Sequence, residues 1–248
     1  MDKKLKAMHK FGLVGKNISY SFSKDYFTKK FKDHQLDNYE YHNFDIQNIS
    51  EFPNIITQNV HGLNVTIPYK EQVIDFLDEI DEDAEKIGAV NTIKITNNKL
   101  KGFNTDVYGF ETSLKTLLKQ QHTRALVLGT GGASKAVIYV LGKLKIDCLL
   151  VSRNPVKDEI SYNDITGEIL KNHKIIINCT PLGTFPDVEN CPNIPYQYIT
   201  EEHLLFDLIY NPIKTKFLLK GEKKGAIICN GLSMLELQAD KSWEIWNQ

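Results

Sequence analysis

The chain has 248 residues, of which 42% are hydrophobic and 25% charged, and 30 basic against 31 acidic residues give a formal net charge of -1. This composition excludes a disordered or fibrous chain, and at about 150 residues per domain the length allows one large or two modest domains. The balanced charge gives no general attraction to nucleic acid or anionic lipid, and no apolar run approaches the length of a membrane span. The charged residues 1–6 and the short apolar run after them do not form a signal peptide, so we expect a cytoplasmic protein.

The first hundred residues alternate short strand-like runs with helical segments. We predict strands at 11–14, 39–44, 62–67 and 89–95, and helices at 24–31 and 71–77. The predicted strands carry many polar residues, but the alternation is that of an α/β domain.

From residue 107 to 230 the strand-like runs are more apolar. We predict strands at 124–129, 146–151, 175–177, 204–206 and 226–229, with a helix at 133–144. Such runs, separated by helices or loops, are typical of a parallel sheet covered on both faces, so this part predicts a Rossmann-like doubly wound unit. The tail at 233–246 has the pattern of an amphipathic helix with no strand after it, and we expect it to pack on the N-terminal domain.

The four cysteines have neither the C-x-x-C spacing nor the nearby histidines of a zinc site; they are Cys148, Cys179, Cys191 and Cys229. Three of them lie in or beside apolar runs. We interpret them as buried small hydrophobic residues and predict no metal.

A glycine-rich turn lies between a predicted strand and a predicted helix, and its residues are Gly129, Thr130, Gly131, Gly132 and Ala133. Glycine at such a junction lets a pyrophosphate approach the backbone N–H groups and the positive end of the helix dipole. Glycines also serve any tight turn, but a strand before and a helix after them favour a nucleotide site.

The end of the next predicted strand indicates which dinucleotide binds. An NAD-binding chain usually places a carboxylate there, about 20 residues past the glycines, where it binds the ribose 2′-hydroxyl. Here the strand end reads Ser152, Arg153 and Asn154, with Lys157 close by. A guanidinium suits a phosphate, and the chain's only other arginine is Arg124. We therefore predict NADP rather than NAD.

Polar residues gather at predicted strand ends in the first half. Alternation along 62–67 places Asn64 and Thr66 on one face, and Lys70 follows just past the strand. Asn91 ends a second such stretch, and Asp106 begins a helix. Taken singly, each has an ordinary structural explanation, since the Asn-Thr-Asp run at 104–106 is a natural helix cap and a single loop lysine is usually solvated.

Together these runs resemble the shikimate dehydrogenase family. The blocks that carry the resemblance stand in the family's order and span Gly15 to Ala239; they are Ser19-Tyr-Ser-Phe-Ser23, Asn64-Val-Thr-Ile-Pro-Tyr-Lys70, Gly88-Ala-Val-Asn-Thr92, Asn104-Thr-Asp106, Gly129-Thr-Gly-Gly-Ala-Ser134, Asn178-Cys-Thr-Pro-Leu-Gly183, Asp207-Leu-Ile-Tyr-Asn-Pro212 and Asn230-Gly-Leu-Ser-Met-Leu-Glu-Leu-Gln238. Eight ordered blocks are far more specific than any single motif.

The resemblance implies an NADP-dependent oxidoreductase that reversibly reduces 3-dehydroshikimate to shikimate, a step of aromatic amino acid biosynthesis. It implies that Lys70 and Asp106 are the catalytic pair. By the same resemblance, the substrate-binding residues are Ser21, Ser23 and Tyr210 for the carboxylate, and Thr66, Asn91 and Gln238 for ring hydroxyls, together with Asn64. Leu208 and Gly231 would line the nicotinamide pocket.

Two departures from the family concern the cofactor. Ser152 stands where many members have Asn, and Lys157 where many have Arg, which bears on the strength of 2′-phosphate discrimination. The chain is also short for the family, so we expect trimmed loops and helices in its nucleotide half.

The resulting prediction is an α/β protein of two domains. A substrate-binding catalytic domain at 1–106 is completed by the C-terminal helix at 231–248, and a Rossmann-like NADP-binding domain spans 107–230. We expect a small-molecule substrate, no nucleic acid or membrane partner, and a monomer or homodimer.

Besides a different nicotinamide enzyme on a similar two-domain fold, two alternatives remain open. The first is an NAD-dependent quinate/shikimate dehydrogenase, although Ser21 with Ser23 favours shikimate and Arg153 favours NADP. The second is a non-catalytic sensor that binds the metabolite, and the presence of Lys70 and Asp106 argues against it.

Overall fold

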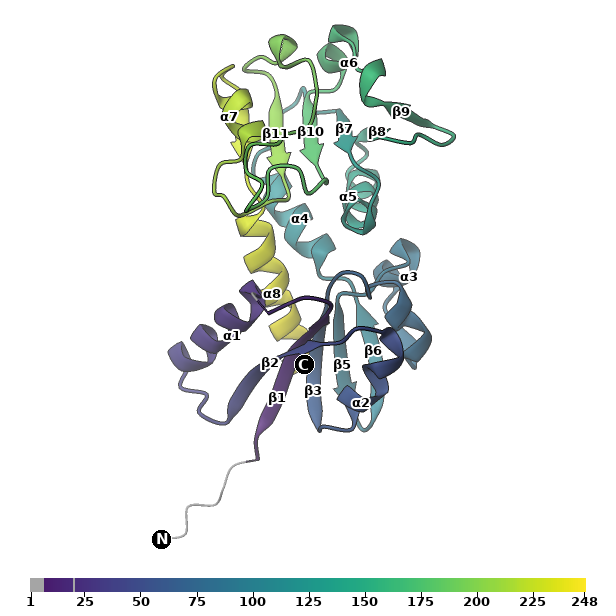
Figure 1. Ribbon diagram of the computed structural model, residues 1–248, viewed down its shortest axis with the longest axis vertical. Coiled ribbons are helices and arrows are strands. Elements are labelled where there is room, and N and C mark those ends of the chain that lie inside the picture. The colour runs from purple at the N-terminus through teal and green to yellow at the C-terminus, as the bar shows by residue number, and fades with distance from the viewer. Residues whose placement is uncertain (1–6, 20) are drawn as a thin grey trace. The chain divides into compact units, whose positions relative to one another are not determined.

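The computed structural model describes residues 7–19 and 21–248, and the chain divides into two compact units (Figure 1). The first unit consists of Met1–Thr105 and Ala239–Gln248, and the second of Asp106–Gln238. Each unit is built around one six-stranded sheet.

The sheet of the first unit is mixed. Its strands are β1 (His9–Gly15), β2 (Tyr39–Asp45), β3 (Val60–Val65), β4 (Glu79–Ile80), β5 (Thr92–Thr96) and β6 (Lys99–Phe103), in the spatial order β2-β1-β3-β5-β6-β4. Strand β1 pairs in parallel with β2 and β3, whereas β5 runs antiparallel to β3 and β6. Asn97 and Asn98 connect β5 to β6 with φ angles of 52° and 61°, a left-handed conformation that asparagine tolerates well.

Helices cover both faces of this sheet. They are α1 (Phe22–Asp33), α2 (Phe52–Ile56), α3 (Glu82–Ile87) and two 3₁₀ segments, Ile49–Glu51 and Gln72–Phe76. Phe27 and Phe31 of α1 belong to one hydrophobic cluster together with Trp246. Phe52 of α2 and Ala84 of α3 belong to a second cluster.

The C-terminal helix α8 (Leu232–Asn247) ends in the first unit. Trp246 Nε1 donates a hydrogen bond to the carbonyl oxygen of Ile93 at 3.0 Å. The indole also occupies the space beside Gly62, where a Cβ would lie 2.4 Å from the ring. Glycine at this position lets the tail pack directly on β3, in agreement with the amphipathic pattern of the tail.

The sheet of the second unit is entirely parallel. Its strands are β7 (Arg124–Leu128), β8 (Asp147–Ser152), β9 (Glu159–Ser161), β10 (Ile175–Asn178), β11 (Leu204–Asp207) and β12 (Ile227–Cys229), in the spatial order β12-β11-β10-β7-β8-β9. The chain reverses its direction of travel across the sheet between β7 and β10, and such a switch point is where nucleotides bind in doubly wound folds. This order confirms the predicted Rossmann-like unit.

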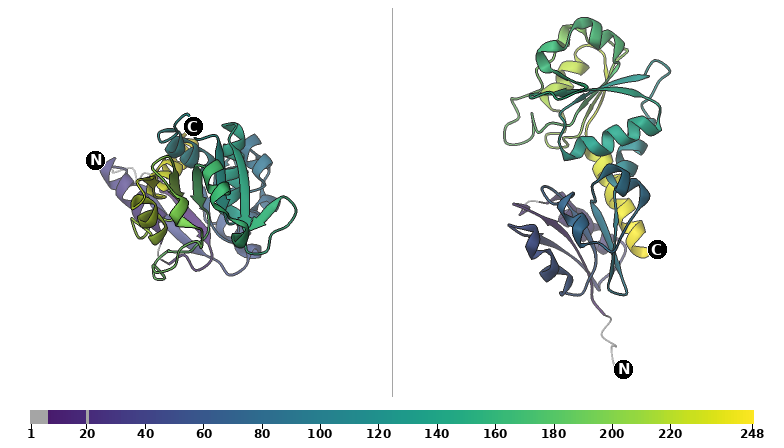
Figure 2. Two further views of the ribbon diagram at one scale, coloured as in Figure 1. Left: turned by 90° about the horizontal axis from the view of Figure 1, so that it is seen from above. Right: turned by 90° about the vertical axis from the view of Figure 1, so that its right-hand side faces the viewer.

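Helices lie on both faces of the parallel sheet (Figure 2). They are α4 (Asp106–Lys115), α5 (Gly132–Lys143), α6 (Gly167–Asn172) and α7 (Lys216–Glu222). Phe110 of α4 contacts Phe206 of β11 edge to face, with ring centroids 5.1 Å apart. Leu205, which points to the opposite face, clusters instead with Leu170 of α6 and Phe217 of α7.

Some predicted elements differ from those in the structure. The segment predicted as a helix at 71–77 is a 3₁₀ turn, Gln72–Phe76, and the strand predicted at 62–67 ends at Val65. It ends there because Thr66 accepts a turn hydrogen bond from Tyr69 N at 3.0 Å. Strands β4, β6 and β9 were not predicted from the sequence.

The connection from β8 to β9 is unusually short for a parallel crossover. It consists of residues 153–158, a fully described stretch that contains no helix.

Among the residues that the structure describes, no helix is both long and apolar enough to cross a membrane. The predicted functional domains, 1–106 with 231–248 and 107–230, stay a prediction. By their contacts, residues 231–238 group with the second unit.

Candidate active site

The glycine-rich turn follows β7 at the switch point of the parallel sheet. Gly129 has φ +94°, a left-handed conformation, and a Cβ there would lie 2.8 Å from Thr180 Cγ2. Gly131 is the N-cap of α5 and makes no side-chain capping bond. Open space surrounds Gly131 and Gly132, where an added Cβ would meet no atom within 4 Å. The first turn of α5 therefore presents backbone N–H groups to a space that an anionic group can enter.

A cavity of about 620 Å³ opens beside this turn. Its lining residues are Gly129, Thr130, Gly131, Ser152, Arg153, Asn154, Tyr162, Cys179, Thr180, Pro181, Leu182, Cys191 and Asn193. The first six of these were predicted as cofactor residues. Of the other cofactor residues predicted on this side, Gly132, Ala133 and Lys157 are exposed but do not line the cavity.

Arg153 follows the last residue of β8 and is exposed at the mouth of this cavity. The Ser152 hydroxyl beside it accepts a hydrogen bond from Asn154 N at 3.2 Å, which bends the chain at the strand end. Arg153 thus follows the carboxyl end of β8, the strand next to the one that leads into the glycine turn. A ribose carrying a phosphate is expected at this place in a doubly wound fold.

The loop after β11 carries two further predicted residues, Leu208 and Tyr210. Gly231 packs against it so closely that a Cβ would lie 2.1 Å from the carbonyl oxygen of Leu208, so any larger residue would displace the loop. Tyr210 is 37% exposed, and partial burial raises its pKa.

The two serines predicted for the substrate lie at the start of α1. Ser21 is the N-cap residue but makes no capping bond, and its buried Oγ has no hydrogen-bond partner among the described residues. Ser23 contacts Tyr41, whose pKa is raised well above its usual value by burial and lowered somewhat by the hydrogen bond with Ser23. A buried hydroxyl without a partner is costly, and a ligand carboxylate could satisfy it.

A buried polar network underlies the first unit's site residues. Asn64 Nδ2 donates to Ser242 Oγ at 2.9 Å and to Thr92 Oγ1 at 3.2 Å, and Asn64 Oδ1 accepts from the Tyr41 hydroxyl at 2.8 Å. Asn91 Oδ1 accepts from the backbone N–H of Thr105 at 2.7 Å. Both predicted amides are thus held by the protein itself.

Lys70 and Thr66 lie in the segment after β3. Lys70 is half-buried, and its carbonyl oxygen accepts a hydrogen bond from Val90 N at 2.7 Å, next to Asn91. Thr66 N donates to Val14 O at 2.9 Å. The first unit therefore brings Lys70 and Asn91 onto neighbouring stretches of backbone.

Asp106 and Gln238 belong to the second unit. Asp106 begins α4 and is half-buried, directly after Thr105 of the buried network. Gln238 is 8% exposed and its Nε2 donates to Leu235 O at 3.0 Å. The catalytic pairing of Lys70 with Asp106 joins residues of different units and stays a prediction.

Several residues at the site were missed by the sequence analysis. Tyr162 lines the cavity with no sequence signal to mark it. Thr180 could have been found, because it lies in the Asn178-Cys-Thr-Pro block at the end of a predicted strand. Within residues 7–19 and 21–248, no three His, Cys, Asp or Glu side chains are grouped to hold a metal ion.

Comparison with known proteins relates this geometry to one family. The family model for the shikimate dehydrogenase substrate binding domain matches residues 13–93. The shikimate dehydrogenase (NADP(+)) of Clostridium beijerinckii is 40% identical over 257 residues, which cover 97% of this chain and 93% of the relative.

Two solved structures are similar over almost the whole chain. Shikimate dehydrogenase from Aquifex aeolicus has a TM-score of 0.87 at 34% identity, covering 97% of this chain and 92% of that one. The Thermus thermophilus enzyme in complex with NADP(H) and shikimate has a TM-score of 0.84 at 28% identity, covering 96% and 93%. The chain belongs to the shikimate dehydrogenase family.

Proposed function

We propose that the protein catalyses the reversible, NADPH-dependent reduction of 3-dehydroshikimate to shikimate in aromatic amino acid biosynthesis. The observation that carries the proposal is the cavity at the switch point, lined by the glycine turn and by Arg153. Family membership supplies the substrate, because the relatives matched over the whole chain are NADP(+)-dependent shikimate dehydrogenases.

The residues present fit NADP(H). The open space at Gly131 and Gly132 suits a pyrophosphate on the N-terminus of α5, and Arg153 suits a 2′-phosphate. The bound cofactor supplies a hydride. Leu208 and Gly231 would then hold its nicotinamide, and Ser152, Asn154 and Lys157 would support Arg153.

The Ser21 hydroxyl, which has no hydrogen-bond partner within residues 7–19 and 21–248, supports a carboxylate site at the start of α1, which Ser23 and Tyr210 would share. Thr66, Asn91 and Gln238 would bind ring hydroxyls. Asn64 is engaged with Tyr41 and Ser242, which favours a supporting role for it beneath the substrate.

Reduction of a ketone builds negative charge on its oxygen, so a proton donor must lie there. Lysine ammonium groups are protonated at neutral pH, and Lys70 Nζ would give its proton to that oxygen. Asp106 would orient Lys70 and accept a hydrogen bond from a substrate hydroxyl. In the oxidation direction Lys70 would take the proton back.

The test is turnover of NADPH with 3-dehydroshikimate, followed by absorbance at steady state. Lys70→Ala and Asp106→Ala should each lower kcat by about 10²- to 10⁴-fold, the usual contribution of a positioned acid or base. Their circular dichroism and thermal unfolding should match the unsubstituted protein. Lys99→Ala, at the exposed start of β6, is the control. Near-normal kcat in both variants would exclude this catalytic pair.

The same assay separates the alternatives. Preference for NADH or for quinate would support an NAD-dependent quinate/shikimate dehydrogenase, and binding without turnover would support a sensor. The proposal also includes a cytoplasmic location, supported by four free cysteines, which suit a reducing compartment. A monomer or homodimer is expected, and light scattering in solution would decide between them.

A further inference from the structure

Asp207 is the last residue of β11 and is fully buried. In the sheet it is the direct partner of Asn178, the last residue of β10, which is also fully buried. A buried carboxylate is costly unless its oxygens receive hydrogen bonds. Those that Asp207 receives come from neutral donors in three different segments.

The two oxygens of Asp207 are used separately. Oδ1 accepts from Asn178 Nδ2 at 3.0 Å and from the backbone N–H of Ile209 at 3.1 Å. Oδ2 accepts from the hydroxyl of Thr215, the N-cap residue of α7. One side chain thus connects the end of β10, the loop after β11 and the start of α7.

The bond from Asn178 to Asp207 and the bond from the Thr180 backbone to Asn178 together set the orientation of the Asn178 amide. An ionised carboxylate only accepts hydrogen bonds, so Asn178 must present its NH₂ group to Asp207 and its oxygen to the other side. That oxygen accepts from Thr180 N at 3.0 Å and from Thr180 Oγ1 at 2.7 Å. Thr180 in turn lines the cavity and lies against Gly129 of the glycine turn. A continuous chain of contacts therefore leads from Asp207 to the cavity.

The bond to Ile209 reaches the cofactor region from a second direction. Leu208 N donates to Asn178 O at 3.0 Å, and Gly231 N donates to Ile209 O at 3.0 Å. The first residues of the loop that carries Leu208 and Tyr210 are therefore fixed by hydrogen bonds to both Asp207 and Asn178.

We propose that Asp207 is a positioning residue for NADPH: its buried carboxylate fixes the Asn178 amide and the loop after β11, and thereby the shape of the cavity wall at Thr180. The inference rests on the proposed function, because it takes NADPH to be the ligand of this cavity. Asp207 does not line the cavity itself.

The titration of Asp207 supports this role. Burial raises its pKa to about 6, and the hydrogen bonds from Thr215, Ile209 and Asn178 offset only part of that rise. Cys179 and Tyr196 are the titratable groups that face it, and its charge contributes to the raised pKa of each, after burial. Below about pH 6 the protonated acid has to donate one of its bonds, and its hold on the Asn178 amide weakens.

The first experiment compares Asp207→Asn with the unsubstituted full chain. Asparagine keeps one accepting oxygen but carries no charge, so the charge-assisted hydrogen bonds from Asn178 Nδ2 and Ile209 N become weaker neutral ones, and its NH₂ group replaces the acceptor that faces Thr215. We expect the Kd for NADPH to rise about tenfold, as for loss of a hydrogen bond to a charged group, with kcat also lower. Asp147→Asn, at the exposed opposite end of the same sheet, is the matched control and should change neither.

Three further readouts separate positioning from a general structural role. Since ionising a buried acid opposes folding, Asp207→Asn should melt no lower than the unsubstituted protein, although it binds NADPH more weakly. Between pH 5 and 7 the NADPH affinity of Asp207→Asn should vary less with pH than that of the unsubstituted protein. Titration of the ligand's 2′-phosphate affects both proteins equally, so it does not contribute to this difference. In a double-substitution cycle with Thr180→Val, the double variant should lose less NADPH affinity than the product of the two single-variant losses.

The inference would be overturned if Asp207→Asn binds NADPH with unchanged affinity, or if the affinity loss of the double variant equals the product of the two single losses. If the unsubstituted protein binds no NADPH, the proposed function fails instead. Amide hydrogen exchange of the ligand-free protein then decides the inference alone. Asp207→Asn should speed exchange in 178–183 and 208–212 but not in β8, and equal exchange in both proteins would refute the positioning role.

Discussion

At the scale of single residues, the chain's two arginines lie at opposite ends of one parallel sheet. Arg124 begins β7 and Arg153 follows β8. Arg124 Nε is 4.0 Å from Asp147 Oδ2, and both side chains are largely exposed, so this ion pair contributes little to stability. Arg153 instead lines the cavity. Position in the fold, rather than residue type, distinguishes Arg153, which we propose selects the cofactor, from Arg124.

Replacing Arg153 with Ala should therefore change cofactor selectivity. The variant loses charge-assisted hydrogen bonds to the 2′-phosphate, so we expect the KM for NADPH to rise about 10- to 100-fold while the KM for NADH changes little. Steady-state kinetics with both cofactors measures this. Arg124→Ala is the control and should resemble the unsubstituted protein. Equal effects of Arg153→Ala on both cofactors would contradict the assignment.

Ser21 allows a test of the substrate site without catalysis. Its buried Oγ has no hydrogen-bond partner among the described residues, so Ser21→Ala removes an unsatisfied group and should leave the ligand-free protein at least as stable. The same change should raise the KM for shikimate about tenfold. Ser19→Ala, an exposed neighbour, is the control. A lower melting temperature with unchanged KM would show that the hydroxyl serves the fold instead.

At the scale of elements, the C-terminal helix packs on the first unit through two tryptophans, of which Trp246 is the more deeply buried. Trp246 is 9% exposed and packs with Phe11, at a ring distance of 4.9 Å, and with Phe27 at 5.3 Å. Its indole N–H also bonds to β5 through Ile93. The last turn of the helix thus packs into a core whose phenylalanines lie more than two hundred positions earlier in the chain.

Trp246→Ala should destabilise the first unit by roughly 3–5 kcal/mol, the usual cost of truncating a buried aromatic residue. For a protein of this size that corresponds to a fall in Tm of about 10 °C. Urea unfolding followed by circular dichroism measures the change. Trp243→Ala is the matched control, because Trp243 is only partly buried and should cost less. Equal costs would show that the last turn has no special part in the core.

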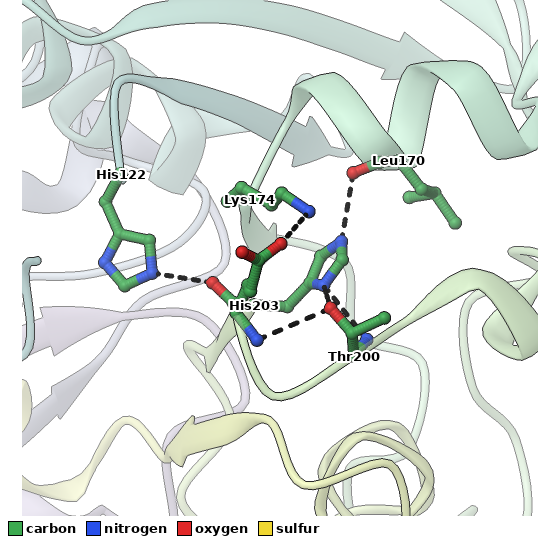
Figure 3. A network of polar contacts seen from close by, with 6 residues as sticks. His122, Leu170, Lys174, Thr200 and His203 are labelled. Carbon is green, nitrogen blue, oxygen red and sulfur yellow. Dashed lines mark hydrogen bonds and ion pairs between the residues drawn. The ribbon is translucent and has the colours of Figure 1, made fainter. Parts of the chain in front are cut away.

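At the scale of the whole molecule, two buried histidines lie at the amino end of the parallel sheet, and we expect them to contribute to its acid stability (Figure 3). His203 Nδ1 accepts from Thr200 N at 3.0 Å, and its Nε2 lies 3.0 Å from Leu170 O. His122 Nδ1 accepts from Lys119 N at 3.0 Å, and its Nε2 lies 3.1 Å from the carbonyl oxygen of Glu202. Each ring therefore carries its proton on Nε2 and is held neutral.

Charged groups near these rings are Lys119, Lys174 and Glu202, and Lys174 pairs with Glu202 at 2.8 Å. Burial is the main cause that lowers the pKa of both histidines. A lowered pKa means that the unfolded chain binds protons more readily than the folded one. The histidines thus contribute stability that is present above about pH 6.5 and is lost as pH falls through their folded-state pKa values.

The melting temperature should accordingly fall between pH 7 and pH 5, and His203→Gln should reduce this slope because glutamine cannot be protonated. Asp207 acts in the opposite direction, since its pKa is raised to about 6 and its protonation favours the folded state. The difference in melting temperature between His203→Gln and the unsubstituted protein, followed across this pH range, gives the contribution of His203. His34→Gln, on the exposed end of α1, is the control. Parallel curves for His203→Gln and the unsubstituted protein would refute the role.

The sequence by itself determined the features that depend on local chemistry. Apolar runs predicted the parallel strands because a strand covered on both faces excludes polar residues, and the glycine turn was visible because Gly129 needs a left-handed φ. Arg153 was found because it stands at a fixed place after a strand. Where local signals were weak, prediction failed: β6 contains two lysines and a glycine, although the Asn97-Asn98 turn before it could have indicated a hairpin.

Only the tertiary structure decided which polar side chains are hydrogen-bonded within the protein and which line the cavity. Asn64 was predicted to bind substrate, yet its amide is hydrogen-bonded to Ser242, which is 178 residues away in the sequence. Thr180 reaches the cavity wall, and Asp207 controls it from a neighbouring strand. Sequence patterns do not contain such contacts, because strand order and register bring distant residues together and leave others, such as the Ser21 hydroxyl, without a hydrogen-bond partner among the described residues.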